Sequence, residues 1–437
     1  MRTRSVRSAV ATGAATSVLL ALLAPLGGAA AADELPGLES DIGVYTDGRT
    51  DTMDIGDPVY RNVDLAAEAL DHGVPYTAGN MHQSIFERDL AAGGTDYYLD
   101  RILGVSGTSG NNVLQTRGRT LYMRGASSAN FSTMGFAGSA YAGGPNNLGS
   151  LYTVTVPGHT VSEVGAERFN APSHAKARYT VGTTGVTADL AKFITYDNVA
   201  VTTLTLTNPG DNAVDLTVRA ASPLATTPVE DADDELVGTR TLTSGSNNGL
   251  VDTAWSKVTI GLKADGFERN GTSLDREVTI PAGGSVDLSV VGVLYSETMP
   301  DSVTEFHEYA EMEPAEAFRT GVTEFNRRWA AEVPYIDVPD PAVEKAIVYR
   351  WWGERYNSLD ANEPGYVYQY PTTIEGVNLY QNAIVLTQPM HLQDTKWLRT
   401  PYLPYGQILN VGELSGSSAF LDSPGHTSWN NHYSQYI

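Results

Sequence analysis

Val199-Ala-Val-Thr-Thr-Leu-Thr-Leu-Thr207, followed by Asn208-Pro-Gly-Asp211 and Ala213-Val-Asp-Leu-Thr-Val-Arg-Ala220, is the stretch that decides the fold class. Both long runs alternate between two kinds of residue and are rich in β-branched side chains, a pattern typical of strands. The Asn-Pro-Gly-Asp sequence between them is typical of a turn. We therefore predict two antiparallel strands joined as a hairpin.

The same pattern recurs further along the chain, at residues 256–262, 276–280 and 285–294. Several short strands punctuated by Gly, Pro and Asn favour a large antiparallel β-sandwich, which we place at residues 61–297. The acidic sequence Glu230-Asp-Ala-Asp-Asp-Glu235 lies inside it. We interpret it as a solvated loop, because it lacks the glycine-turned ligand spacing of a calcium site.

The character of the sequence changes after this region. Apolar residues at helical spacing predict a helix at residues 313–331. Asp340 is a suitable N-cap and Pro341 suits a first helical position, so a second helix is expected from there to about residue 359. We place a helical linker at residues 298–340 and a helical domain at residues 341–437.

The N-terminus has the three parts of a secretory signal peptide: three arginines, an apolar run at residues 18–24, and small residues at 27–32. The apolar run is far shorter than the ~20 residues that a membrane span needs, which disfavours a retained anchor. We therefore predict a signal peptide at residues 1–32, a polar N-terminal segment at 33–60, and a secreted, extracellular mature protein without membrane insertion.

Composition narrows the possible partners. The 437 residues carry a formal net charge of −23 and include no cysteine. A protein this acidic repels phosphate backbones and anionic membrane surfaces, so nucleic acid is not an expected partner. The lack of cysteine excludes disulfides, thiol catalysis and cysteine-based zinc sites. We predict no metal and no cofactor, and carbohydrates remain as the favoured partners.

The region beyond Tyr349 is unusually aromatic, and many of its rings lie in stretches broken by Gly and Pro. Rigid rings with a polar tip suit sugars, which offer C–H faces and hydroxyl groups. Val343, Ile347 and Trp351 lie at helical spacing, so we interpret them as the buried face of the helix that begins at Pro341. The candidates for sugar contact, with core packing as the alternative, are Tyr368, Tyr370, Trp397, Tyr402 and Tyr405.

Asp394 is the leading candidate among the acidic residues of this region. It lies in His391-Leu-Gln-Asp-Thr-Lys-Trp397, and Lys396 and Arg399 are close enough in sequence to favour its charged form. An ordinary surface ion pair is the alternative interpretation. Hydrolysis of a glycoside requires two carboxyl groups, and the sequence leaves the catalytic residues unknown.

Four sequences carry a resemblance to a known family: Tyr335-Ile-Asp-Val-Pro-Asp-Pro341, Arg350-Trp-Trp-Gly-Glu-Arg355, Gln393-Asp-Thr-Lys-Trp-Leu-Arg399 and Trp429-Asn-Asn-His-Tyr433. Together they resemble the start of the (α/α)6 barrel of the inverting six-hairpin glycosidases, among which the mannosylglycerate-hydrolase-like and family 63-like enzymes are the most similar. The resemblance covers about residues 313–437. It implies a multidomain β + α protein: an N-terminal antiparallel β-sandwich, a helical linker, and the start of an (α/α)6 barrel.

The resemblance also implies that Asp394 and Trp397 grip the sugar, and that Asn430 belongs to a water-positioning asparagine pair. With the neighbouring aromatic and basic residues, the substrate-binding candidates are Asp394, Trp397, Arg399, Tyr402, Tyr405, Trp429 and Asn430. Six helical hairpins require twelve helices, whereas residues 341–437 have room for about three or four. We therefore expect an incomplete barrel, a fragment without its catalytic acid and base, with a small helical cap as the alternative.

The function that these observations favour is a secreted glycoside hydrolase acting on oligo- or polysaccharide. Two alternatives remain open. One is a non-catalytic carbohydrate-binding surface module, and the other is a polysaccharide lyase, which is disfavoured because the lyases we compare place their helical part before the sandwich.

Overall fold

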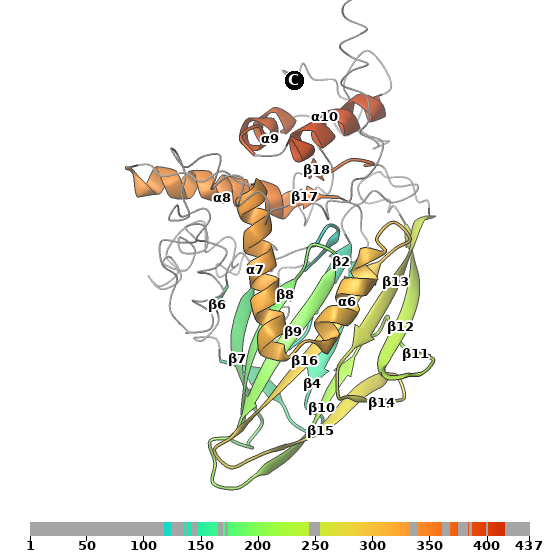
Figure 1. Cartoon of the computed structure of the whole chain (residues 1–437), viewed down its shortest axis with the longest axis vertical. Helices are drawn as coiled ribbons and strands as arrows, with labels where there is room; N and C mark the ends of the chain where they lie inside the picture. Colours follow the sequence, from blue (N-terminus) through green and yellow to red (C-terminus); the bar gives the residue numbers. More distant parts are fainter. Residues whose placement is uncertain are drawn as a thin grey trace, which may run out of the picture. The chain divides into compact units, whose positions relative to one another are not determined.

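The chain folds as an antiparallel β-sandwich followed by helices (Figure 1). The computed structural model describes residues 118–123, 134–136, 139–141, 147–164, 169–170, 174–243, 254–332, 339–360, 368–374, 383, 387–398 and 401–415. The predicted order, with the sandwich before the helices, is confirmed. The predicted signal peptide and the polar segment at residues 33–60 lie outside the described residues.

A nine-stranded sheet is the larger layer of the sandwich. In spatial order it contains β11 (Thr227–Val229), β12 (Ala232–Thr243), β13 (Ala254–Lys263), β16 (Ser285–Tyr295), β9 (Val199–Thr207), β8 (Thr187–Ile194), β7 (Ala175–Val181) and β5 (Val161–Glu163), while β6 (Phe169–Asn170) also pairs with β7. All of these pairings are antiparallel.

A four-stranded sheet forms the second layer, with the order β14 (Glu268–Asn270), β15 (Ser273–Ile280), β10 (Val214–Ala221) and β4 (Thr153–Thr155). Two small sheets accompany the sandwich. One contains β1 (Leu121–Met123), β2 (Ser139–Tyr141) and β3 (Asn147–Gly149), and the other contains β17 (Ser358–Leu359) and β18 (Thr372–Thr373).

The nine-stranded sheet is buried on both faces in its central part. One face contributes Leu204, Leu288 and Val290 to a core shared with Leu216 and Val278 of the four-stranded sheet. The opposite face packs against helices, as described next. This double burial explains why β16 is buried without interruption from Leu288 to Leu294, whereas β10, which has one face in the core, alternates between buried and partly exposed residues.

The outer face of the nine-stranded sheet carries α6 (Asp301–Glu311) and the first half of α7 (Pro314–Glu332) (Figure 1). Phe306, Tyr309 and Ala317 of these helices pack on Val201 and Val293 in a second apolar cluster. The predicted helix at residues 313–331 is therefore confirmed by α7. The segment expected as a linker has a structural role, since it covers apolar sheet surface that would otherwise face water.

The predicted hairpin across Asn208-Pro-Gly-Asp211 is wrong. β9 pairs with β8 and β16 in the nine-stranded sheet, while β10 pairs with β15 and β4 in the other sheet. The turn therefore passes from one layer of the sandwich to the other. Both strands have one face in the same core, and the alternating pattern cannot distinguish two strands of one sheet from two strands that face each other across a core.

A second crossing turn lies beside the first, at Pro281-Ala-Gly-Gly284 between β15 and β16. The two turns are hydrogen-bonded to each other: Asn208 N donates to Gly284 O over 2.9 Å, and Gly283 N donates to Gly210 O over 3.1 Å. The Asn208 side-chain amide nitrogen also donates to Ile280 O and Pro281 O, over 3.2 and 3.1 Å. These bonds hold the two layers together at one end of the sandwich.

Three further helices follow: α8 (Pro341–Asn357), α9 (Gln388–Thr395) and α10 (Tyr402–Ser415). The helix expected from Pro341 is thus confirmed, and Trp351 is buried as predicted. The prediction for Val343 is wrong, because this side chain is 47% exposed. Val343 lies in the first turn of α8, whereas Arg350, Trp351 and Glu354, the residues of α8 that bond to α9, lie further along the helix. None of the described helices is long and apolar enough to span a membrane.

Candidate functional site

Asp394 lies near the end of α9 and is held by Arg350 of α8. Arg350 Nε donates to Asp394 Oδ1 over 2.9 Å, and a terminal guanidinium nitrogen donates to Oδ2 over 2.6 Å. The Trp351 indole N–H donates to the backbone carbonyl of Asp394 over 3.2 Å. A bidentate guanidinium contact is a strong, geometrically specific form of carboxylate pairing. The side chain of Asp394 is thereby oriented at the α8–α9 contact.

The expected partners of Asp394 are partly wrong. The Lys396 ammonium donates to the side chain of Gln393 and lies 5.2 Å from the centre of the Trp397 ring. Lys396 follows the end of α9, so its side chain leaves the helix in a different direction from that of Asp394. Arg350, which is remote in sequence, takes the expected role because α8 packs on α9. Arg399 lies outside the described residues.

Three aromatic candidates are strongly exposed. Trp397 is 63% exposed, Tyr402 is 42% exposed and Tyr405 is 49% exposed. Trp397 immediately follows α9, and both tyrosines belong to the first turn of α10. We call these three residues the aromatic face. Tyr368 and Tyr356, by contrast, are buried in the core. The predicted residues Trp429 and Asn430 lie outside the described residues.

Side-chain amides lock α10 against the strand β18 and against α9. Gln407 donates to Thr373 Oγ1 over 2.6 Å, and Gln388 donates to the backbone carbonyl of Gln407 over 2.8 Å. Asn410 Oδ1 accepts the backbone N–H groups of Gln369 and Tyr370, over 3.1 and 3.2 Å. The start of α10, with its two exposed tyrosines, is therefore carried on a rigid support.

Buried polar atoms without a hydrogen-bond partner gather in the same region. Among the described residues of α8, α9, α10 and β18 they include Glu354 Oε2, His391 Nε2, Gln388 Oε1, Gln407 Oε1 and Thr372 Oγ1. His391 and Glu354 bind each other through their remaining polar atoms, over 2.8 Å. Buried polar groups in folded proteins are nearly always hydrogen-bonded.

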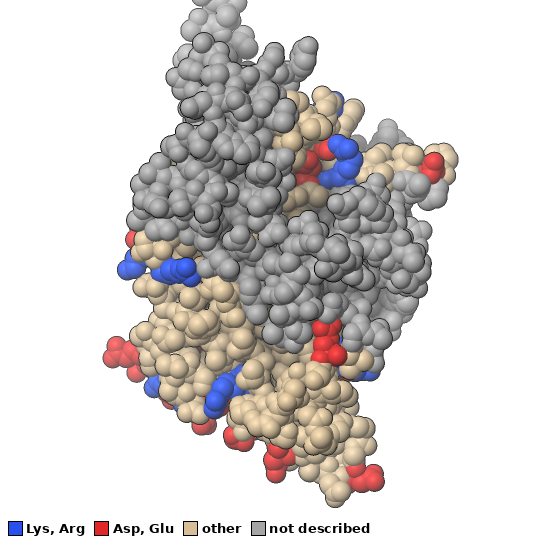
Figure 2. Space-filling model, turned by 180° about the vertical axis from the view of Figure 1, so that it is seen from behind, with Lys and Arg blue, Asp and Glu red and all other residues tan. Residues whose placement is uncertain are grey.

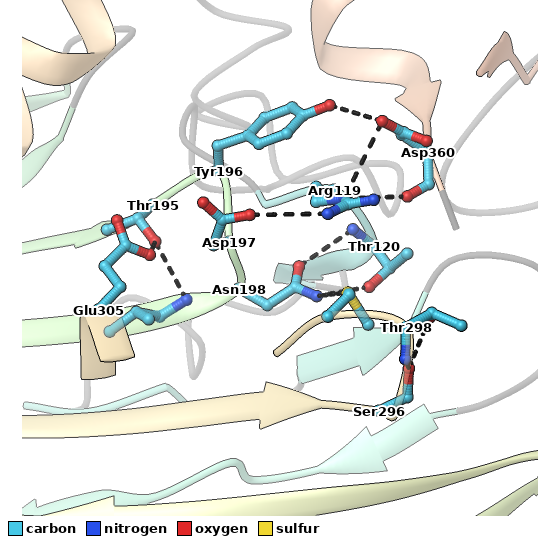
Figure 3. Close-up of polar contacts among 12 residues, drawn as sticks. Arg119, Thr120, Thr195, Tyr196, Asp197, Asn198, Ser296, Thr298, Glu305 and Asp360 are labelled. Carbon is cyan, nitrogen blue, oxygen red and sulfur yellow. Dashed lines mark hydrogen bonds and ion pairs between the residues drawn. The ribbon is translucent and has the colours of Figure 1, made fainter. Parts of the chain in front are cut away.

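A second cluster lies where the sandwich meets the helices, and the sequence analysis missed it (Figure 3). The Tyr196 hydroxyl donates to Asp360 Oδ2 over 2.7 Å. Arg119 lies between Asp197 and Asp360, at 3.8 and 3.9 Å from their carboxylate oxygens. Arg328 lies with its guanidinium carbon 3.8 Å from the centre of the Tyr196 ring. We call Arg119, Tyr196, Asp197, Arg328 and Asp360 the junction cluster.

Burial governs the protonation of this cluster and its surroundings. Burial raises the pKa of Asp197, while Arg328 and Arg119 act in the opposite direction. Glu305 of α6 accepts a 2.7 Å hydrogen bond from Thr195 Oγ1, and burial followed by the charge of Asp197 raises its pKa well above the ordinary value. Burial and then Asp360 likewise raise the pKa of Tyr196.

Raised pKa values are common at active sites, but structural networks show them as well. Tyr196, Asp360 and Glu305 are all engaged with other protein groups, so we assign a structural role to the junction cluster. Tyr196 and Asp360 are 164 positions apart in sequence. The only local signal was a Tyr-Asp-Asn sequence between two strands, which predicts a turn and not a network.

The acidic sequence at residues 230–235 forms the turn between β11 and β12 and the start of β12. The Lys263 ammonium binds both carboxylate oxygens of Asp234, over 2.9 and 2.8 Å, and lies 3.8 Å from Glu235. In the part of the chain that the structure describes, no cluster of His, Asp and Glu has a metal-binding arrangement. On the described part of the face in Figure 2, acidic and basic side chains are scattered singly or in small groups.

No known family model matches the chain. Among solved structures, it is similar to a human-microbiome protein provisionally named a kojibiose phosphorylase, with a TM-score of 0.38 and 9% identity over 60% of this chain and 41% of that protein. It is also similar to a family GH92 inverting mannosidase from Bacteroides thetaiotaomicron, with a TM-score of 0.35 and 11% identity over 68% of this chain and 43% of that enzyme.

A further similar structure is a family GH92 α-mannosidase from the same bacterium, with a TM-score of 0.24 and 8% identity over 56% of this chain and 36% of that enzyme. The chain thus spans less than half the length of these three proteins. Likenesses with TM-scores this low do not assign a function.

Proposed function

We propose that the chain is part of a secreted glycoside hydrolase and that its aromatic face binds the carbohydrate substrate. The observation that carries the proposal is the exposure of Trp397, Tyr402 and Tyr405 within nine positions of sequence. Exposure of large aromatic rings to water is unfavourable, so a ligand that covers the rings gains binding free energy. Sugars suit this role, because their C–H faces stack on rings and their hydroxyl groups reach polar neighbours.

The polar neighbour is the pair of Arg350 and Asp394. Asp394 belongs to α9, three positions before Trp397, and 19% of its side chain is exposed. Arg350 is 58% exposed, and its guanidinium group carries only N–H donors, whereas the carboxylate of Asp394 only accepts. This pair therefore offers both acceptors and donors to sugar hydroxyls. The resemblance of Gln393-Asp-Thr-Lys-Trp-Leu-Arg399 to a sugar-gripping motif of the six-hairpin glycosidases points to the same residues.

Catalysis itself remains unassigned, since hydrolysis needs a general acid together with a base or nucleophile. Asp394 is proposed as a binding residue, because it is paired to the guanidinium group of Arg350. The substrate-binding role of Arg399, Trp429 and Asn430 rests on the sequence and belongs to the same proposal.

Binding can be tested by titrating short neutral oligosaccharides into the protein in a calorimeter. Trp397→Ala should weaken binding by about three- to tenfold, the value of one good ring contact. Met390→Ala is the matched control, because Met390 is also on α9 and is 56% exposed. Equal effects of the two substitutions would reject the aromatic face as the binding surface.

Product analysis separates the three functional classes. A hydrolase releases reducing sugars, a lyase releases unsaturated products that absorb ultraviolet light, and a binding module releases neither. If the protein hydrolyses a glycoside, Asp394→Asn should lower kcat/KM by about tenfold or more, because a buried charged hydrogen bond is worth ~1.5–3 kcal/mol. Unchanged kinetics would reject the role of Asp394.

Export is tested separately. N-terminal sequencing of protein from the culture supernatant should begin close to Asp33, because the signal peptide is expected to be removed there. Recovery of the intact N-terminus from the cytosol would contradict export without affecting the proposed binding surface.

A further inference from the structure

The outer face of the nine-stranded sheet changes character along its strands. Beneath α6 and α7 it presents Val201, Val291 and Phe193, whereas further along the same strands the outward positions are Thr205, Asp287 and Asp189. Side chains two positions apart on a strand share one face, so this is a single surface that turns from apolar to polar. The helices α6 and α7 lie over only part of this sheet (Figure 1).

A groove of about 530 Å³ occupies this polar part, lined by Lys176, Arg178, Asp189, Thr205 and Asp287 from the sheet and by Phe318 from α7. Its volume lies within the ~300–1,000 Å³ that is typical of ligand pockets. The first turn of α7 forms one wall through Pro314, Ala315 and Phe318. The groove thus has a polar floor and an apolar wall.

The floor is a straight row of four groups on four neighbouring strands. Strand pairing places Arg178 opposite Asp189, Asp189 opposite Thr205, and Thr205 opposite Asp287. Neighbouring strands lie ~4.8 Å apart, so the row extends over about 14 Å. Arg178 binds Asp189 in a bidentate manner, over 2.6 and 3.1 Å, and Thr205 Oγ1 donates to Asp287 over 2.6 Å. These contacts hold the four side chains in place before any ligand arrives.

The charge of the lining is balanced, with two cations and two carboxylates. Lys176 lies 4.9 Å from the centre of the Phe318 ring, and Arg178 and Asp189 are 41% and 43% exposed in their side chains. A balanced lining in a protein of net charge −23 does not attract a strongly charged ligand. Alternating donors and acceptors beside an apolar wall fit a neutral polyol chain instead.

We propose that this groove is a second carbohydrate-binding site, which takes a short neutral oligosaccharide along the row from Arg178 to Asp287. The sugar hydroxyls exchange hydrogen bonds with Asp189, Arg178 and Asp287, and the C–H groups lie against Pro314 and Ala315. The site shares its ligand class with the aromatic face and none of its residues. It would hold one part of a polysaccharide on the sandwich while another part of the same polysaccharide contacts the aromatic face.

The test uses the full chain carrying Trp397→Ala, so that binding at the aromatic face is weakened and binding at the groove is easier to measure. Neutral gluco-, manno- and galacto-oligosaccharides are titrated by calorimetry, with an oligogalacturonate as the acidic comparison. Adding Asp287→Ala should weaken binding of the neutral oligosaccharide about tenfold, because it removes a charged acceptor. Adding Ala315→Trp should abolish binding, because Ala315 is an exposed wall residue and a large ring fills the groove.

The four-stranded sheet supplies a matched control. Asp215 is exposed and accepts a 2.6 Å hydrogen bond from Thr279 Oγ1, in the same way that Asp287 accepts one from Thr205. Asp215→Ala should leave binding unchanged, and thermal melting checks that each variant is folded. Equal weakening by Asp215→Ala and Asp287→Ala, unchanged binding in both groove variants, or binding of the oligogalacturonate alone would overturn the proposal.

The titrations distinguish failure of the proposal for the aromatic face from failure of the proposal for the groove. If Trp397→Ala has no effect while Asp287→Ala weakens binding, the aromatic face is rejected and the groove is supported. If Trp397→Ala weakens binding while Asp287→Ala and Ala315→Trp have no effect, only the groove is rejected. The absence of any oligosaccharide binding by the unmodified protein rejects both.

Discussion

At the scale of single residues, glycines show how closely the core is packed. Gly292 of β16 lies against the ring of Tyr152, and a Cβ atom at this position would be 2.7 Å from that ring. Tyr152 cannot easily move away, because its hydroxyl group binds Ala200 O, Thr202 Oγ1 and Val290 O inside the sandwich. The space beside Gly292 is thus occupied by the ring of Tyr152, which its hydrogen bonds hold in place.

Gly292→Ala should destabilise the protein by ~1–3 kcal/mol, the usual result of overpacking a core. Gly353→Ala is the control, because no atom lies within 4 Å of the added Cβ and the position is in the interior of α8. That control should be neutral or stabilising by up to ~1 kcal/mol, since alanine favours helix more than glycine. Urea denaturation of both variants checks the contrast, and similar free energies of unfolding would contradict it.

At the scale of elements, the two crossing turns determine which strands belong to which layer. Asn208 is the residue that ties them: besides its contacts with Ile280 and Pro281, its amide nitrogen donates to Asn212 O over 2.8 Å and its Oδ1 accepts from Gly210 N over 3.0 Å. A single side chain thus satisfies backbone groups of both turns.

Asn208→Ala should lower the free energy of unfolding by ~2–4 kcal/mol, because it leaves several backbone groups at a buried position without partners. Asn270→Ala is a suitable comparison, since Asn270 is exposed and its amide nitrogen donates to Asp275. We expect a change within ~0.5 kcal/mol for the comparison. Chemical denaturation measures both, and a mild effect at Asn208 would show that the turns do not depend on it.

The contact between α6 and the sheet depends on pH through Glu305. Its pKa is raised well above the ordinary glutamate value of 4.5, mainly by burial and next by the charge of Asp197. The folded state therefore holds this proton more tightly than the unfolded state does. The stability contributed is present below about pH 4.5 and is lost as the pH rises through the higher folded pKa.

Glu305→Gln should consequently make the protein more stable than the unmodified form at neutral pH, because glutamine carries no charge to bury and still accepts the bond from Thr195. The advantage should shrink as the pH falls toward 4.5. Free energies of unfolding measured across this pH range provide the check. An advantage that grows on acidification would contradict the assignment.

At the scale of the whole molecule, the junction cluster joins parts of the chain that are distant in sequence. Tyr196 follows β8, Asp360 follows β17, and Arg328 belongs to α7. Besides the side-chain contacts, the backbone N–H of Asp360 donates to Arg119 O over 3.1 Å. The cluster couples the sandwich to the region that carries the aromatic face.

Asp360→Ala should weaken this coupling by ~3–5 kcal/mol. The substitution removes the carboxylate that the buried Arg119 and Tyr196 side chains contact, and loss of one partner of a buried pair is strongly destabilising. We expect a thermal transition of the helical region below that of the sandwich, where the unmodified protein unfolds more cooperatively. Calorimetry resolves the two transitions. Asp233→Ala is the control, since Asp233 is 86% exposed and its ion pair with Arg269 should contribute little. Identical melting of the two variants would refute the coupling.

The sequence by itself determined the class of the fold and several of its elements. β-branched alternation and turn residues predicted the strands, and helical spacing with Asp340-Pro341 predicted α7 and α8. It also identified Asp394, Trp397, Tyr402 and Tyr405 as candidates, and the rings of the last three are exposed. Such signals are local, since they depend on backbone preference and on which face of an element is apolar.

Only the tertiary structure decided how these elements are assembled. It separated β9 from β10 into different layers, paired Asp394 with Arg350, exposed Val343, and brought Tyr196 to Asp360. The physical reason is the same in each case. The alternation of a strand records that one face is buried, and the charge of a side chain records that it needs a partner. Neither records which distant segment supplies the buried face or the partner, because that depends on the packing of the complete chain.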